Sequence, residues 1–123
     1  MLTIDVEKTL DVVVVRCAGR LVRGGAISDL RNAVISEHDT RIVVLDMTEV
    51  ETIDAGGLTE LVSLHHWTNE RGIQLKLVNP SHFVLETLQT LHLDHVFDIS
   101  TLHDALIVLA NTSHEAAHYA ACH

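Results

Sequence analysis

Three short stretches of the chain are rich in apolar residues, and each stretch is followed by a segment with helical features. The stretches are VVVV at residues 12–15, IVVL at 42–45 and IQLKLV at 73–78. Strands with apolar residues at consecutive positions are typical of sheets whose two faces are both covered. Apolar strands that alternate with helices therefore predict an α/β fold, with helices packed against one mainly parallel sheet.

Turn and capping residues set the expected limits of the elements. Gly72 is expected to stop a helix, and Ser81 can cap the next one after a turn at Asn79-Pro80. The face that this third helix is expected to bury consists of Val84, Leu85, Leu88 and Leu91. The expected strands are 2–7, 12–18, 41–47, 73–78 and 95–100, and the expected helices are 26–36, 54–69, one after Ser81 and one from Thr101.

The order of elements predicts a single domain. A mixed, mainly parallel sheet of about five strands is expected to pack against four helices, within residues 1–110. The last part of the chain, 111–123, is rich in histidine and poor in core residues, so it is expected to be a frayed helix extension or disordered. A chain of 123 residues is long enough to bury one core.

The charge and the hydropathy pattern exclude several classes of protein. A net charge of −9 argues against a broad nucleic-acid surface, and no apolar run is long enough to insert into a membrane. The acidic start of the chain is unlike a secretory signal, so a cytoplasmic protein is expected. Cys17 and Cys122 have no spacing typical of a disulfide framework or a metal site.

No catalytic motif is present, so an enzyme is not expected. The chain lacks GxSxG, a P-loop and a dinucleotide fingerprint, and GRLVRGG at 19–25 is interpreted as a turn. No cofactor is expected either. Four acidic residues cluster around one expected loop, and a solvated acidic loop is favoured there over a magnesium site. They are Asp46, Glu49, Glu51 and Asp54.

The histidines of the tail are a weaker candidate for a metal site. His114 and His118 share a face if the tail is helical, and His123 lies nearby. Imidazoles at that spacing bind Zn²⁺ or Ni²⁺. No further ligand completes the set at a fixed distance, so a functional metal site is not predicted.

The stretch TIDAGGLTEL at 52–61 starts the second helix in an unusual way. Asp54 is expected to cap the helix by accepting from the amide of Gly56 or Gly57. Two adjacent glycines disfavour a helix, and they leave backbone amides open. The glycine pair therefore has two equally good interpretations: a site at which a partner or an anion docks, or a purely local feature of the helix start.

These stretches resemble the STAS domain, the fold of bacterial anti-sigma-factor antagonists and of sulfate-transporter cytoplasmic tails. The resemblance covers residues 2 to about 110 and rests on AGRLVRGGA, IVVLDMTEVETIDAGGL and GIQLKLVNPS. In antagonists the most specific segment reads Asp-Ser-Ser-Gly or Asp-Ser-Thr-Gly, and the second hydroxyl residue is phosphorylated by the partner. In this chain the segment is Asp54-Ala55-Gly56-Gly57, so the lost phosphosite is Gly56.

The resemblance implies a non-catalytic interaction module of a partner-switching pathway. The partner would be an anti-sigma factor or a related histidine-kinase-like ATPase, and without a hydroxyl the module would behave as permanently unphosphorylated. Thr52 and Thr59 are alternative acceptors, as are Ser28 and Ser63. The expected partner-binding residues are Asp54, Ala55, Gly56, Gly57, Leu58, Arg20 and Arg23.

Two other functions of the same fold stay open at this point. One is a subunit of an ABC-type lipid transport system that binds the transporter ATPase, and the other is a module that senses a nucleotide or another anion. A homodimer is also left open.

Overall fold

The computed structural model describes residues 2–36 and 39–100, which form one five-stranded sheet with three helices. The strands lie in chain order across the sheet. β1 pairs antiparallel with β2, and all other pairs are parallel. The strands are β1 (Leu2–Thr9), β2 (Val12–Leu21), β3 (Ile42–Ile53), β4 (Gln74–Val78) and β5 (Asp98–Ser100).

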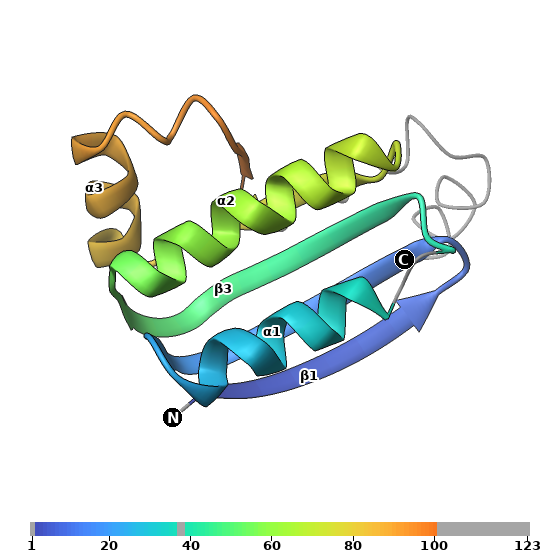
Figure 1. The fold of residues 1–123 in the computed structure, drawn as a ribbon, viewed down its shortest axis with the longest axis horizontal. Coiled ribbons are helices and arrows are strands. Elements are labelled where there is room, and N and C mark those ends of the chain that lie inside the picture. The colour runs from blue at the N-terminus through green and yellow to red at the C-terminus, as the bar shows by residue number, and fades with distance from the viewer. Residues whose placement is uncertain (1, 37–38, 101–123) are drawn as a thin grey trace, which may run out of the picture.

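The helices α1 (Gly25–Ile35) and α2 (Ala55–Glu70) lie side by side along the sheet, and α3 (His82–Thr90) lies near the beginning of α2 (Figure 1). The mixed five-stranded sheet is thus confirmed. The fourth predicted helix and the tail 111–123 lie outside the described residues. Within the part of the chain that is described, no helix is both long and apolar enough to cross a membrane.

The core explains the apolar runs of the sequence. Val13 and Val15 point into the large cluster beneath the helices, together with Leu30 of α1 and Leu61 of α2. The alternate residues belong to the other face of the sheet, where Ile42, Val44 and Val78 form a second buried cluster with Val12 and Val14 packed against it. Because residues on both faces of the sheet are buried, the central strands carry apolar residues at consecutive positions.

Two strands extend further than expected. β2 continues to Leu21 and β3 to Ile53, because the two strands stay paired to their ends, with Leu21 beside Ile53; among the described strands, the second half of β3 has no other neighbour. The interpretation of GRLVRGG as a turn is therefore wrong for its first three residues. Glu49 and Glu51 are exposed strand residues and not part of a loop.

The third helix shows one correct and one wrong prediction. Ser81 caps α3, with its hydroxyl oxygen accepting from the amide of Val84 at 3.3 Å. Val84 and Leu88 are buried as expected, whereas Leu91 is 51% exposed. Leu91 is the residue after the last turn of the helix, where the chain leaves the core, so helical spacing no longer decides its burial.

Candidate functional site

Asp54 joins two loops at one end of the sheet. It lies between β3 and α2 in an extended conformation, and its Oδ1 accepts from the amide of Gly57 at 2.9 Å. Its Oδ2 accepts from the amide of Arg23, in the turn before α1, at 3.0 Å. The hydrogen bond from the backbone amide of Arg23 is the main cause that lowers the pKa of the Asp54 carboxyl, and the hydrogen bond from the amide of Gly57 is the second. The predicted helix cap is confirmed. The sequence did not predict the second hydrogen bond, by which Asp54 also holds the Arg23 loop.

Gly57 is required by packing inside the domain. It is buried, and a Cβ at this position would overlap the carbonyl oxygen of Leu21 and lie 2.8 Å from Cγ1 of Ile53. The start of α2 therefore touches the end of β2, with no room for a side chain. This close contact accounts for the second glycine without any visiting molecule.

Gly56 lies in a different environment. It is half-buried, and a Cβ there would lie 3.1 Å from Cδ1 of Ile27 and 3.3 Å from Cβ of Arg23. Oδ1 of Asp54 is also 3.3 Å away, so all three neighbours are side-chain atoms, and a side chain at position 56 requires them to shift by a few tenths of an ångström. Position 56 thus reaches the surface beside the Arg23 loop, and neighbouring Ala55 is exposed.

The other predicted site residues are only partly brought together. Leu58 is buried in the core beneath the helix start. Arg23 is exposed in the turn next to Asp54. Arg20 was expected in a loop, but it is an exposed residue of β2, opposite Thr52 of β3.

The two alternative hydroxyls differ in access. Thr59 is exposed on α2, and its hydroxyl donates to the carbonyl oxygen of Ala55 at 2.8 Å. Thr52 is half-buried in β3. Neither lies at position 56, where glycine has no hydroxyl.

An ion pair behind the site was not predicted. Glu60, in the second turn of α2, is buried, and its carboxylate accepts from Nε of Arg31 at 2.6 Å and from Nη2 at 2.9 Å. The hydrogen bond to Glu60 raises the pKa of the Arg31 guanidinium. This two-point bond ties α1 to α2. Glu60 falls among the apolar positions of the helix that face the core, and a charged residue at such a position indicates a buried ion pair.

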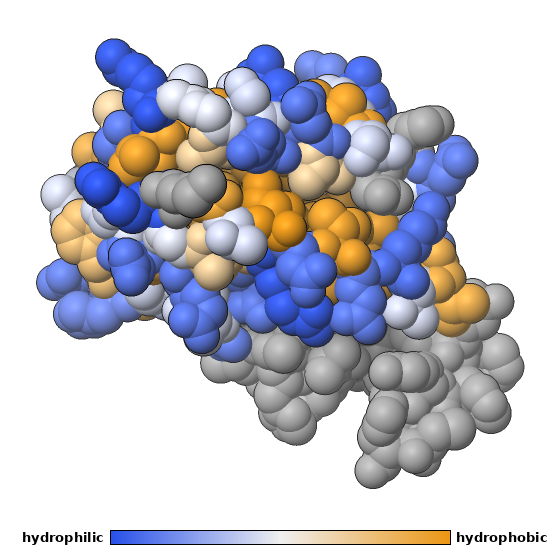
Figure 2. Space-filling model, turned by 90° about the horizontal axis from the view of Figure 1, so that it is seen from below, coloured by the Kyte–Doolittle hydropathy of each residue, from blue (hydrophilic) through white to orange (hydrophobic). Residues whose placement is uncertain are grey.

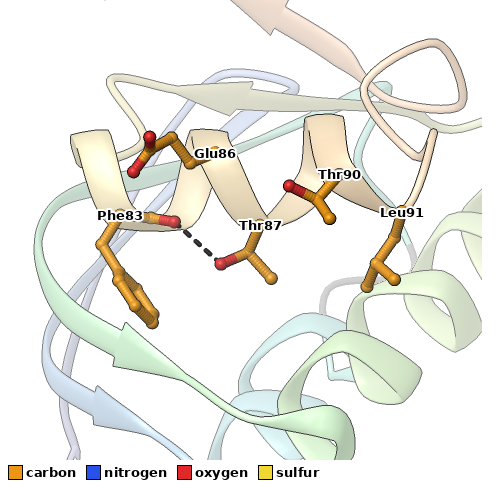
Figure 3. Close-up of a pocket in the computed structure, with 5 residues that line it drawn as sticks. All are labelled: Phe83, Glu86, Thr87, Thr90 and Leu91. Carbon is orange, nitrogen blue, oxygen red and sulfur yellow. Dashed lines mark hydrogen bonds between the residues drawn. The ribbon is translucent and has the colours of Figure 1, made fainter.

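A shallow hollow lies along α3. Its volume is about 380 Å³, and it is lined by Phe83, Glu86, Thr87, Thr90 and Leu91. Figure 3 shows that Phe83, Thr87 and Leu91 point to the same side of the helix, and the Thr87 hydroxyl donates to the carbonyl oxygen of Phe83 at 2.9 Å. All of its lining comes from α3 and the residue after it, and Glu86 points to the opposite side of the helix from Phe83, so the hollow is a shallow surface patch.

No metal centre is formed by the residues that the structure describes, since nowhere among them do three or more His, Cys, Asp or Glu side chains come close enough to hold an ion. Asp46 lies in β3, and its Oδ1 accepts from the hydroxyl of Thr48 in the same strand at 2.6 Å. The histidines of the tail lie outside the described residues.

Comparison with known proteins identifies the family. The family model of the STAS domain matches residues 3–116. The chain belongs to the STAS domain family. No significant match was found among curated protein sequences.

Solved STAS domains of several proteins have the same fold. The Bacillus protein SpoIIAA, an anti-sigma factor antagonist in its unphosphorylated form, superposes with a TM-score of 0.75 at 16% identity, over 90% of this chain and 99% of SpoIIAA. An anti-sigma factor antagonist from Mycobacterium paratuberculosis gives 0.70 at 23% identity, over 88% and 93%. A sulfate transporter family protein from Wolinella succinogenes gives 0.73 at 21% identity, over 81% and 85%. At these identities the likeness establishes the fold.

Proposed function

We propose that this STAS domain is a non-catalytic interaction module of a partner-switching pathway. Its partner is an anti-sigma factor or a related histidine-kinase-like ATPase, bound through residues 54–57 and the first turns of α2. The observation that carries the proposal is Gly56, a half-buried position at a helix start that has no side chain. By resemblance to the antagonists, this is the position of the phosphorylated hydroxyl.

The geometry divides the work among the site residues. Ala55, Gly56 and Arg23 present the surface that a partner touches. Asp54 holds the two loops together through its bonds to both amides, while Gly57 supports the helix start from within. A partner that docks here meets a preformed shape, which reduces the ordering cost of binding.

An anion or nucleotide sensor at this helix start is less well supported. The amides of Arg23 and Gly57, which an incoming anion would use, already donate to the Asp54 carboxylate. A bound phosphate would have to displace that carboxylate or lie beside it, and like charges at close range repel.

Binding to the ATPase-type anti-sigma factor of the same cell tests the docking surface. Calorimetric titration of the full chain should show that Gly56→Glu weakens binding about tenfold or more, because it adds bulk and charge at the centre of the contact. Asn69→Glu is the matched control, since Asn69 is an exposed residue at the far end of α2. Equal affinities of the two variants, or no binding by the wild type, would contradict the proposal.

Phosphorylation tests the loss of the switch. With the same ATPase and ATP, the wild type should take up no phosphate at residues 52–59, whereas Gly56→Ser should be phosphorylated at the new hydroxyl. Mass spectrometry of the digested protein locates the group. A phosphate on Thr52 or Thr59 of the wild type would restore a switch at a neighbouring position and refute permanent docking.

A further inference from the structure

The outer edge of the sheet carries a groove that the proposed function does not use. Among the strands that the structure describes, β1 is an edge strand that pairs only with β2, so half of its backbone N–H and C=O groups point away from this sheet. The groove lies between this strand and α1, has a volume of about 470 Å³, and is lined by Leu2, Ile4, Val6, Asp29, Asn32 and Ala33.

The floor of the groove is apolar. Leu2, Ile4 and Val6 are alternate residues of β1, so they share the face that α1 partly covers, and Val6 is 41% exposed. Figure 2 shows hydrophobic side chains gathered along the middle of the surface between α1 and β1, with polar side chains above and below. A free strand edge beside an open apolar groove is the geometry to which an extended segment adds as a further strand.

The edge carries charges of both signs, and the acidic residues Asp5, Glu7 and Asp29 outnumber the basic residues Lys8 and Arg16. Asp29 lines the groove and makes no ion pair within the described part of the chain. On the opposite face of β1, Asp5 and Glu7 share one guanidinium, that of Arg16, at 4.0 and 3.0 Å. One cation between two carboxylates leaves that face acidic.

These charges argue against a second copy of the chain as the occupant. If two β1 strands pair antiparallel with their apolar faces on one side, the registers that pair most of the strand place Asp5 opposite Asp5, or Asp5 opposite Glu7. Like charges that are directly opposite destabilise a strand pair. A register centred on Ile4 avoids this, but it leaves the end of the strand unpaired.

We propose that the β1 edge binds an extended segment of another protein, in which apolar residues alternate with lysine or arginine. The apolar side chains fill the groove above Leu2, Ile4 and Val6. The basic side chains lie on the other face, beside Asp5 and Glu7. This surface is separate from the Asp54 loop, so a partner can occupy each of them at the same time.

A synthetic peptide of alternating lysine and valine, acetylated and amidated, is the probe. Fluorescence anisotropy with the full chain should show saturable binding, and the same peptide with N-methylated backbone amides should bind about tenfold more weakly, because strand addition requires backbone hydrogen bonds. Equal binding of the two peptides would mean that charge attraction alone holds the peptide, and it would overturn the proposal.

Variants of the chain locate the binding surface. Val6→Arg places a charge in the groove and should weaken binding of the unmodified peptide about tenfold. Leu10→Arg is the matched control, because Leu10 is an exposed apolar residue outside the groove and the change in charge is the same. Circular dichroism checks that both variants fold. Equal effects of the two variants would place the peptide elsewhere.

Sedimentation of the chain without peptide tests the other occupant. A monomer is expected at concentrations at which the peptide binds. A dimer that Val6→Arg dissociates would show that a second copy covers the edge, and the proposal would be wrong.

Discussion

The substitution Gly57→Ala tests the packing that sets the start of α2. The added Cβ would overlap the carbonyl oxygen of Leu21, an atom that also accepts from the amide of Asp54 at 3.4 Å. Because the obstacle is backbone, relief requires a movement of the end of β2 or of the helix start. Overpacking of this kind costs about 1–3 kcal/mol or more, and alanine returns about 1 kcal/mol through its helix propensity.

Because the obstacle is backbone, the upper end of this range applies, so a net loss of about 2 kcal/mol is expected, which corresponds to a fall of about 6–10 °C in the unfolding midpoint. Urea unfolding followed by circular dichroism measures the free energy of unfolding directly. Gly25→Ala is the matched control, since Gly25 is also the start of a helix and a Cβ there has nothing within 4 Å. The same stability for Gly57→Ala and Gly25→Ala would refute the packing argument.

Three further predictions follow from other contacts. Arg31→Met should lower the unfolding midpoint more than Arg16→Met, although the two arginine side chains are similarly exposed. The reason is that only the loss of Arg31 leaves a buried carboxylate, that of Glu60, unpaired. Equal shifts of the two variants in thermal unfolding would contradict this. Burial raises the pKa of Cys17 to about 12, so at pH 8 iodoacetamide should modify Cys17 only in guanidinium, and peptide mass spectrometry would reveal labelling of the folded chain. The pKa of Asp54 is lowered in the folded state, so its contribution to stability is complete above the unfolded pKa of about 3.9 and is lost as pH falls through the folded value. In urea unfolding, the difference in stability between the wild type and Asp54→Asn should therefore be larger at pH 7 than at pH 2. A difference that does not change with pH would argue against the two hydrogen bonds from backbone amides to the Asp54 carboxylate.

What could be predicted from the sequence is what depends on near neighbours in the chain. The consecutive valines of residues 12–15 indicated a strand buried on both faces, and Asp54 and Ser81 indicated helix caps. Caps and buried strands have short-range signatures, because the partner atom lies within a few residues or the pattern repeats every two residues.

The contacts that shape the site are long-range, and sequence patterns do not contain them. The bond from the amide of Arg23 to Asp54 joins residues 31 positions apart, and the pair of Arg31 and Glu60 joins residues 29 positions apart. The end of β3 was misplaced for a related reason: Glu49 was interpreted as a loop residue, whereas it is an exposed residue of a strand that pairs on one side only. An acidic residue on such a strand is compatible with pairing, because its side chain points to water.

The two glycines at the start of α2 therefore have different physical causes, and the difference bears on function. Gly57 is fixed by the backbone of β2, so no functional explanation is needed for it. Gly56 is not fixed in the same way: it lies in a helix, and a Cβ would press on the end of the Ile27 side chain, which can shift. Serine at position 56 should accordingly be tolerated at a cost far below that of alanine at 57. Packing therefore accounts for Gly57 but not for Gly56, and phosphorylation of Gly56→Ser tests the proposed loss of a phosphosite at this position.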